Sequence, residues 1–440
     1  MPLKIAVVGA GVCGLAATKA LTAAGFAVTC YEQSDRLGGL WALDNPSGVA
    51  AAYRSLSTNT SKERTAFGDF PMPPEWPHYP RHDQILSYLE EYVDRFAFRD
   101  AIVFGTRVET AEPRAGGGWL LRLAGGEEVA FDALVVANGH HWSPRLPAPP
   151  IPGSFDGLTM HSRDFRDAEP FRGKRVAVVG MGNSAMDIAV DCSFIARKTF
   201  LAMRRGVHVI PKTWFGIPSD RIRRHPLLPF KVRQFLTRLL TRVSVGVQRT
   251  YGLPEPTHEV LTAHPTLSDD IFPRLRAGAV EPVPEIVELL GDRVRFAGGR
   301  IEALDAIVYC TGYDFLFPFL PAEVAAGLDT TIPLFRRMVP IGVPNLFFIG
   351  LASAVGSIFP LAESQSEWLV DILRGEYAPP DDTAMRADVA REHAATRRRY
   401  VASKGHVAQV DVDLYVASLE RERAAGAKRT EAAPMLRSRP

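Results

Sequence analysis

The chain begins with a glycine pattern, GAGVCGL, in which Gly9, Gly11 and Gly14 occupy the places of a G-x-G-x-x-G turn. Such a turn lets the pyrophosphate of a dinucleotide approach the free N–H groups at a helix N-terminus, because glycine has no Cβ to block it. Glu32 follows Gly14 by 18 residues, where its carboxylate can accept a hydrogen bond from a ribose hydroxyl. A lone glycine triplet is a weak signal, but together with this acid it predicts a dinucleotide site. The segment GGLW (Gly38–Trp41) resembles the continuation found when the nucleotide is FAD.

A second glycine pattern, GMGNSAMD, has Gly180, Gly182 and Ala185 in the corresponding places. The strand expected after it ends in Arg204 and Arg205 rather than in an acid. A carboxylate there would repel a 2′-phosphate, whereas a guanidinium can bind it with two hydrogen bonds. We therefore predict an NADPH site, the alternative being that both arginines merely flank a strand at the surface.

The expected secondary structure places both patterns in βαβ units of parallel strands. A proline-rich linker, PRLPAPPIPG at 144–153, predicts a domain boundary between the two units. The first unit should have strands at 4–8 and 28–32 around a helix at 15–24. The second should begin with a strand at 175–179. Further along the chain we expect a strand at 346–350 and a helix at 362–374.

The composition excludes several classes of protein. With 51 basic and 49 acidic residues among 440, the net charge of +2 is too small to predict nucleic-acid binding. No two of the four cysteines have the spacing of a redox-active disulfide or a zinc site, which argues against the commonest disulfide reductases and for a cytoplasmic location. No apolar run is long enough for a transmembrane segment, and no secretory leader is expected. The sequence is compatible with a homodimer but does not fix the oligomeric state.

The stretch FDGLTMHSRDF fits the pattern F-x-G-x-x-x-H-x-x-x-F through Phe155, Gly157, His161 and Phe165. It resembles the pattern of flavin-containing monooxygenases, whose Baeyer–Villiger relatives carry Trp where this chain has Phe165. The resemblance implies that this segment links domain arrangement to turnover, so we do not assign His161 as an acid or base. Further blocks resemble the same family, namely 56–73, 264–271, 309–320, 347–351, Glu363 with Gln365, and 399–411.

The resemblance implies an α/β fold of two Rossmann-like dinucleotide-binding domains, the NADPH domain being inserted into the FAD domain. We expect the FAD domain at 1–152 and 317–440 and the NADPH domain at 153–316. A loose polar tail is predicted from about Arg423, where the chain becomes charged and loses periodicity. The hydrophobic C-terminal anchor of the animal enzymes is absent, which suggests a soluble bacterial type.

The resemblance also implies the chemistry. NADPH reduces FAD, O₂ adds to the reduced flavin to give a C4a-hydroperoxide, and a soft nitrogen or sulfur nucleophile takes the distal oxygen. The small-molecule substrate itself is not defined by any motif. Baeyer–Villiger oxygenation of ketones is the main alternative. Further alternatives are a non-oxygenating NADPH oxidase or dehydrogenase and a redox-sensing binding protein without turnover.

Asn59 is the residue that we expect to take part in oxygen chemistry, because the family has an asparagine in this flavin-side segment. A neutral amide can donate a hydrogen bond to reduced flavin without adding a proton source. The alternative is an asparagine that only closes an Asx-turn. Tyr53 resembles a side chain that lines the same cavity in bacterial relatives. The expected cofactor-binding residues are Gly9, Ala10, Gly11, Val12, Cys13, Gly14, Glu32, Gln33, Gly39, Leu40, Trp41, Tyr53, Thr58, Asn59, Thr60, Val108, Gly180, Gly182, Asn183, Ser184, Ala185, Met186, Asp187, Arg204, Arg205, Thr311, Gly312 and Gln365.

The stretch 231–243 predicts an amphipathic helix with arginines among its polar positions. Most such helices pack their apolar side on their own protein. The alternatives are that this helix contacts a membrane or a partner, or that it covers the active site.

Overall fold

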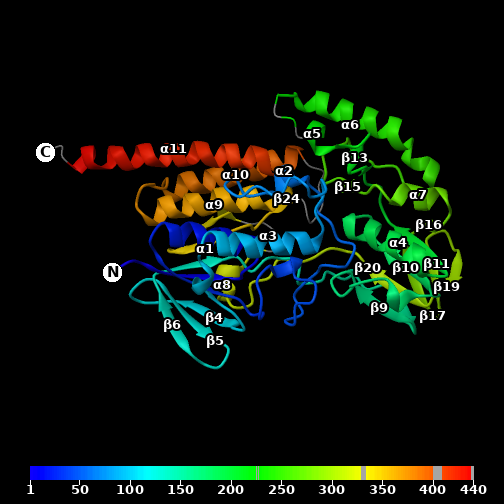
Figure 1. Ribbon diagram of the computed structural model, residues 1–440, viewed down its shortest axis with the longest axis horizontal. Helices are drawn as coiled ribbons and strands as arrows, with labels where there is room; N and C mark the ends of the chain where they lie inside the picture. The colour runs from blue at the N-terminus through cyan, green and yellow to red at the C-terminus, as the bar shows by residue number, and fades with distance from the viewer. Residues whose placement is uncertain (224, 226, 329–332, 400–408, 438–440) are drawn as a thin grey trace.

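The computed structural model describes residues 1–223, 225, 227–328, 333–399 and 409–437. It contains two parallel five-stranded sheets, one in each half of the view in Figure 1. The first sheet has the order β23-β7-β1-β2-β3, and every neighbouring pair is parallel. Its strands are β1 (Lys4–Val8), β2 (Ala27–Tyr31), β3 (Ile102–Val103), β7 (Ala133–Val136) and β23 (Leu346–Phe348).

Both faces of the first sheet are covered, as the apolar composition of its strands requires. On one face Ile5 and Val7 pack in a core with helices that lie side by side in Figure 1. On the other face Ala6 and Val8 pack against an antiparallel three-stranded meander. The helices are α1 (Val12–Ala23), α3 (His82–Arg95) and α9 (Ile358–Leu373), and the meander consists of β4 (Val108–Pro113), β5 (Trp119–Leu123) and β6 (Glu128–Phe131).

The second sheet has the order β16-β11-β10-β20-β9 and is also fully parallel. One face packs against α4 (Asn183–Ile195) and α7 (Ile271–Arg276), and the other against a four-stranded sheet of order β19-β18-β17-β8. The strands are β8 (Gly153–Phe155), β9 (Leu158–His161), β10 (Arg175–Val179), β11 (Lys198–Met203), β16 (Val280–Pro284), β17 (Ile286–Gly291), β18 (Arg293–Phe296), β19 (Ile301–Ala303) and β20 (Ala306–Tyr309).

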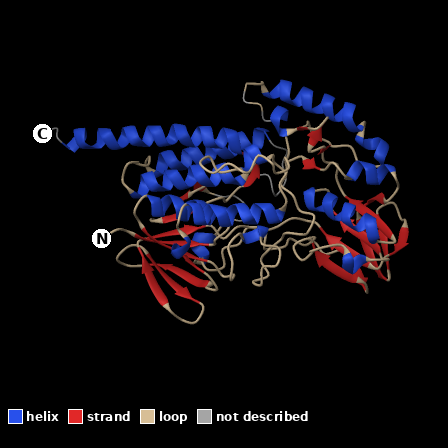
Figure 2. Cartoon of the chain, viewed as in Figure 1, coloured by secondary structure: helices blue, strands red, loops and turns tan. Residues whose placement is uncertain are grey.

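All of these strands lie between β7 and β23 in the sequence, although β7 and β23 are neighbours in the first sheet. The second Rossmann-like unit is therefore inserted into the first, which confirms the predicted fold class. Figure 2 shows the two groups of strands at opposite ends of the view, with loops and helices between them.

Short elements complete the described chain, many of them in the connections between the two units. They are α2 (Lys62–Thr65), β12 (Val209–Ile210), β13 (Thr213–Trp214), β14 (Ile217–Pro218), α5 (Asp220–Arg223), β15 (Thr266–Leu267), α8 (Ala322–Ala325), β21 (Leu334–Phe335), β22 (Val339–Pro340), β24 (Ser353–Val355) and β25 (Gln409–Asp411). None of the helices in the described part of the chain is long and apolar enough to cross a membrane.

The prediction of a loose tail from about Arg423 is wrong, because helix α11 (Val412–Arg437) continues through this segment. Arg423 forms ion pairs of 2.7 Å with Glu367 and Asp371 on α9. The segment is rich in Ala, Glu and Arg, which favour helix, and the ion pairs attach its polar surface to the body of the protein. Residues 438–440 of that predicted tail lie outside the described residues, as do 400–408 of the block predicted at 399–411.

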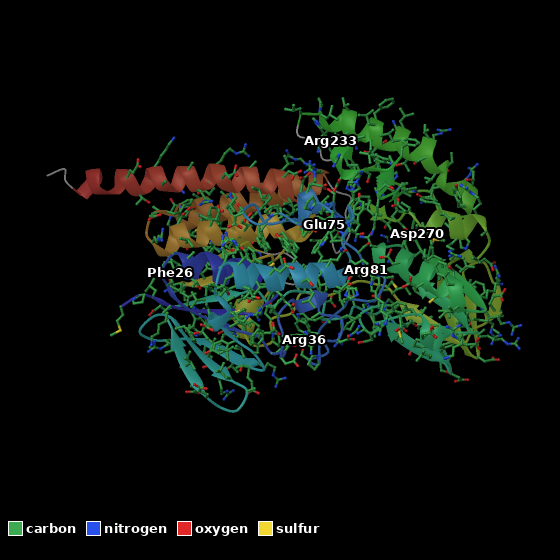
Figure 3. The ribbon with its side chains drawn as sticks, viewed as in Figure 1. Phe26, Arg36, Glu75, Arg81, Arg233 and Asp270 are labelled. Atoms are coloured by element: carbon green, nitrogen blue, oxygen red, sulfur yellow. The ribbon has the colours of Figure 1, made fainter. Side chains whose placement is uncertain are left out.

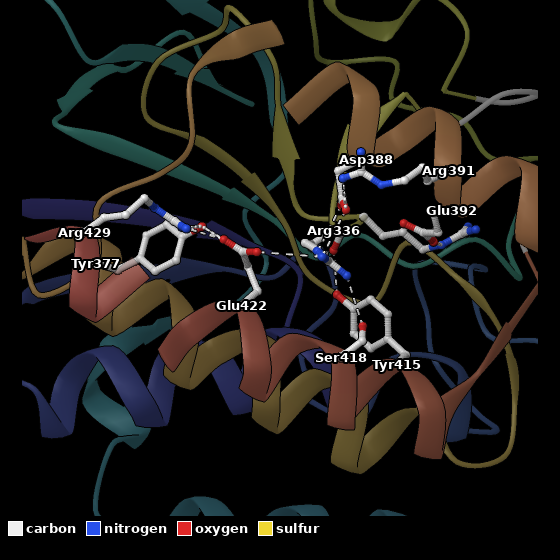
Figure 4. A network of polar contacts seen from close by, with 10 residues as sticks. Arg336, Tyr377, Asp388, Arg391, Glu392, Tyr415, Ser418, Glu422 and Arg429 are labelled. Carbon is white, nitrogen blue, oxygen red and sulfur yellow. Dashed lines mark hydrogen bonds and ion pairs between the residues drawn. The ribbon is translucent and has the colours of Figure 1, made fainter. Parts of the chain in front are cut away.

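A network of partly buried ion pairs fixes α11 and α10 (Asp382–Arg399) against the β21–β22 hairpin (Figure 4). Arg336 contacts Asp388 at 3.1 Å and Glu422 at 3.7 Å. The Tyr415 hydroxyl donates to the Arg336 carbonyl at 2.6 Å and accepts from the amide nitrogen of Gln365 at 2.7 Å. The first turns of α11 bury Val412, Tyr415 and Leu419 in the core, whereas ion pairs of Arg423 and Arg429 hold the part for which a loose tail is predicted.

Helix α6 (Phe230–Val245) forms where an amphipathic helix is predicted, but the interpretation that its apolar side packs on the protein is wrong. Phe235 and Val243 are 55% and 64% exposed, whereas Gln234 and Thr237 are buried. The Gln234 amide donates to the Val260 carbonyl at 2.8 Å, so a polar side chain anchors the helix. Figure 3 places Arg233 at the end of α6 that faces the first unit.

Candidate dinucleotide and active site

A cavity of about 700 Å³ lies at the carboxyl ends of the first sheet's strands and extends toward the second unit. This is the edge at which open parallel α/β sheets bind ligands. The cavity brings together sixteen of the predicted residues from both units. They are Gly9, Gly11, Val12, Cys13, Glu32, Gln33, Gly39, Leu40, Trp41, Tyr53, Thr58, Asn59, Thr60, Val108, Asn183 and Ser184.

The first glycine turn has the close backbone packing that the pattern predicts. A Cβ on Gly14 would lie 1.7 Å from the Gly9 carbonyl oxygen, so the helix can approach the turn only without a side chain there. Gly9 has φ +104°, a conformation that L side chains rarely adopt. Gly11 and Gly39 meet backbone to backbone, since a Cβ on Gly39 would lie 3.1 Å from the Gly11 Cα. The wall that faces the cavity is therefore bare backbone, as a pyrophosphate requires.

Glu32 directly follows β2 and is a buried carboxylate that receives two backbone hydrogen bonds, from Ala10 N at 2.8 Å and from Ser34 N at 2.9 Å. Burial raises the pKa of Glu32, and the backbone N–H groups oppose that rise. Each carboxylate oxygen has a further lone pair, so Glu32 can hold the turn and still accept from a ribose hydroxyl.

The segment around Asn59 has buried polar atoms that no described residue satisfies. The Oγ1 of Thr58 and the Oδ1 of Asn59 are both buried without a hydrogen-bond partner among the described residues. Unpaired buried polar atoms are rare in folded proteins and usually indicate a missing ligand or water. Because both residues line the cavity, they fit a bound flavin with polar edges.

The second glycine turn resembles the first in backbone geometry. Gly180 has φ +139°, and a Cβ there would lie 2.5 Å from the Cys310 carbonyl oxygen. Gly182 faces open space and begins α4, whose first residues Asn183 and Ser184 line the cavity. The Asn183 side chain accepts from Leu267 N at 2.8 Å, which fixes the turn against the β15 segment. This helix N-terminus fits a second dinucleotide phosphate.

Arg204 and Arg205 follow β11 directly and are exposed, outside the cavity lining. Neither forms an ion pair with the residues that the structure describes. Both residues therefore follow the carboxyl end of β11, next to the strand that precedes α4, where a 2′-phosphate is expected.

Replacing Arg204 with alanine should raise the KM for NADPH about tenfold to hundredfold, because one charge-assisted contact to the 2′-phosphate is lost. The KM for NADH should stay within about twofold. Steady-state NAD(P)H oxidation measures both values, and an equal loss for the two cofactors would mean that Arg204 only supports the strand. Arg197→Ala, a change to an arginine just before the same strand, serves as the control.

Besides the two arginines, ten predicted residues do not line the cavity. They are Ala10, Gly14, Gly180, Gly182, Ala185, Met186, Asp187, Thr311, Gly312 and Gln365. Gln365 is buried, and its side-chain oxygen accepts from Gly350 N at 2.8 Å. The Thr311 hydroxyl donates to the Arg145 carbonyl. These two residues hold loops that form the wall.

Three groups of lining residues were not predicted from the sequence. One follows β7 and another follows β23, where the shared strand direction could have indicated them. The third comes from the segments near α5 and α6, which no motif marks. They are Ala137, Asn138, Gly139, His140, His141 and Trp142, then 352–359, then Asp220, Arg223, Phe230 and Arg233.

His161 is buried, and its Nδ1 accepts from Arg163 N at 3.1 Å. Burial lowers the pKa of His161, so the ring is neutral at pH 7. Phe165 of the same segment packs edge-on against Tyr53, with ring centroids 5.9 Å apart.

In the first glycine turn, burial raises the pKa of the Cys13 thiol to about 12, which leaves it protonated and unreactive.

Comparisons with known proteins agree with this geometry. A family model described as flavin-binding monooxygenase-like matches residues 3–431. The chain is 34% identical over 443 residues to flavin-containing monooxygenase 5 of Oryctolagus cuniculus, covering 95% of this chain and 81% of that protein. It is also 34% identical over 444 residues to a dimethylaniline monooxygenase 2 of Rattus norvegicus described as N-oxide-forming, covering 96% and 83%.

Among solved structures, the S-allyl-L-cysteine S-oxygenase of Allium sativum superimposes with a TM-score of 0.72 at 24% identity, covering 99% of this chain and 94% of that one. An open crystal structure of cyclohexanone monooxygenase gives a TM-score of 0.73 at 18% identity, covering 97% and 98%. At these identities the two structures support the fold alone.

Proposed function

Since the chain belongs to the flavin-binding monooxygenase-like family, as its match over residues 3–431 shows, we propose that it oxygenates a soft nitrogen or sulfur nucleophile at the cavity beside Asn59. Its cofactors are FAD and NADPH. The overall reaction converts substrate, O₂, NADPH and one proton into oxygenated substrate, NADP⁺ and water. FAD supplies the chemistry, since it accepts hydride from NADPH and activates O₂.

The observation that most favours an oxygenase is the buried side-chain oxygen of Asn59, which has no partner among the described residues and lies in a cavity lined by the first glycine turn and the start of α4. The Gly9–Gly14 turn and Glu32 would hold the FAD pyrophosphate and ribose, while Asn183, Ser184 and the arginines after β11 would hold NADPH. Asn59 would orient polar groups of both cofactors without providing a proton. A cytoplasmic location and a homodimer remain predictions.

The cavity wall around Asn59 is suited to keeping stray protons from the reacting atoms. His140 lines it, and burial lowers the pKa of this histidine well below its ordinary value. Burial raises the pKa of Tyr53 well above its ordinary value. Both side chains are therefore neutral at pH 7 and are poor proton donors.

Sulfides and tertiary amines should be better substrates than ketones, because Phe165 stands where the Baeyer–Villiger relatives carry Trp. The test is a competition between thioanisole and a cyclic ketone, with products identified by mass spectrometry. We expect sulfoxide to exceed lactone by about tenfold or more, the equivalent of 1.4 kcal/mol. Faster lactone formation would favour the Baeyer–Villiger alternative instead.

A further inference from the structure

Residues 53–61, which include Asn59, extend from the first unit but are bonded by side chains to the second. The Tyr53 hydroxyl donates to the Asp187 carboxylate at 2.6 Å, and the Ser55 hydroxyl donates to Asp191 at 2.5 Å. Both acids lie on α4, directly after the second glycine turn. The helix expected to bind NADPH phosphate is thus hydrogen-bonded to the start of this segment.

Two further contacts lie on either side of Asn59. The Lys212 ammonium donates to the Ser57 hydroxyl at 2.8 Å and to the Thr58 carbonyl at 3.1 Å. Asp220 accepts from the Ser61 backbone N–H at 2.7 Å. Lys212 lies between β12 and β13, and Asp220 begins α5, so both belong to the inserted part of the chain. We call Lys212 and Asp220 the Asn59 clamp.

The clamp residues are charged and almost completely buried, with Lys212 8% and Asp220 1% exposed. Water therefore competes little for their hydrogen bonds, and charge-assisted bonds in such surroundings are strong. Lys212 also acts on α4, since its positive charge lowers the pKa of Asp187 against the rise that burial causes. One ammonium thus stabilises the segment and the acid that binds Tyr53.

The first unit holds the same segment mainly through backbone hydrogen bonds. Thr58 N donates to the Pro80 carbonyl and His82 N to the Leu56 carbonyl, each at 2.9 Å. Asn59 itself has a buried oxygen without a partner in the described chain, so its own side chain does not fix its position. The clamp supplies bonds from the second unit on both sides of it.

We propose that Lys212 and Asp220 are positioning residues that set Asn59 relative to both cofactors, so that the segment moves with the NADPH-binding unit. The proposal rests on the proposed function, because it assigns Asn59 to the reacting cavity. Shifting such a group by about 1 Å can reduce the rate by about a hundredfold. The effect should fall on oxygen transfer rather than on hydride transfer, because the NADPH phosphates would be bound at the second glycine turn and at Arg204 and Arg205, outside the Asn59 segment that the clamp holds.

The experiment compares Lys212→Met, Asp220→Ala and Asp220→Asn with Lys231→Met, a change to an exposed lysine of the same inserted part. Lys212→Met and Asp220→Ala should keep NADPH oxidation within about threefold but reduce the product formed per NADPH about tenfold or more, H₂O₂ making up the difference. Asp220→Asn retains an acceptor for Ser61 N and should restore most of the coupling. Lys231→Met should match the wild type.

Hydrogen–deuterium exchange of the cofactor-free proteins gives a second measurement. Amides at 57–61 should exchange faster in Lys212→Met and Asp220→Ala, while a distant peptide in β4–β5 should not change. Unchanged exchange and unchanged coupling in Lys212→Met and Asp220→Ala would overturn the proposal. It would also be overturned if Asp220→Asn formed no more product per NADPH than Asp220→Ala. If the wild type makes no oxygenated product, the proposed function fails, but the exchange result still decides whether the clamp holds the segment. If Lys212→Met does not fold, the two Asp220 variants decide the question.

Discussion

Replacing Asn59 with alanine should lower the yield of oxygenated product about a hundredfold to a thousandfold while NADPH oxidation continues. Hydride transfer depends on holding the nicotinamide against the flavin, which phosphate binding at the Gly180–Ala185 turn and at the arginines after β11 would largely arrange. Oxygen transfer depends on hydrogen bonds at the flavin edge, which Asn59 would supply, since its buried oxygen has no partner among the described residues. The electrons should therefore appear as H₂O₂, measured against product and NADPH consumed in the same reaction.

Asn59→Asp should be at least as damaging as Asn59→Ala, because a carboxylate would repel reduced, anionic flavin. Asn45→Ala is the matched control, since Asn45 closes a local turn by accepting from Ser47 N at 2.9 Å. That variant should change stability without changing the ratio of product to H₂O₂. An Asn59→Ala enzyme with wild-type coupling would show that Asn59, like Asn45, only closes a turn.

Replacing Gly14 with alanine should cost about 3 kcal/mol or more of stability and abolish tight FAD binding. By helix propensity alone this change would be favourable by about 1 kcal/mol, since Gly14 lies within α1. The new Cβ, however, would lie 1.7 Å from the Gly9 carbonyl oxygen. Gly9 cannot easily move aside, because its N–H donates to the Tyr31 carbonyl at 2.8 Å.

Gly116→Ala is the control for this prediction, since a Cβ on Gly116 meets nothing within 4 Å. Calorimetry should show a lower Tm for Gly14→Ala alone, and the purified variant should have a low ratio of flavin to protein absorbance. A Gly14→Ala protein that retains full flavin and the wild-type Tm would contradict the packing argument.

The elements that position the cofactors were largely predictable from the sequence. Lys4–Val8 and Arg175–Val179 form strands at the predicted residues, because short apolar runs before glycine turns are typical of buried parallel strands. Helix α9 begins at Ile358, earlier than the 362 predicted from apolar composition. The Ser357 side chain caps the helix by accepting a hydrogen bond from Phe359 N. This cap starts α9 before the apolar residues from which the helix was predicted.

Other parts depend on contacts between residues far apart in the sequence. The C-terminal part of helix α11 is held by ion pairs such as that between Arg423 and Asp371, which no local pattern reveals. The exposed apolar side of α6 follows from Gln234 and Thr237 packing inward, and periodicity cannot tell which face is buried. Lys212 and Asp220 lie in loops and a short helix, so only the fold shows that they contact the Asn59 segment.

The most direct test of oxygenation is turnover of a sulfide or tertiary amine with NADPH under ¹⁸O₂, with the product analysed by mass spectrometry. The account predicts that one ¹⁸O atom enters each product molecule, that one NADPH is oxidised for each, and that water supplies no product oxygen. Complete recovery of the electrons as H₂O₂, with no labelled product from any sulfide or amine tested, would contradict it.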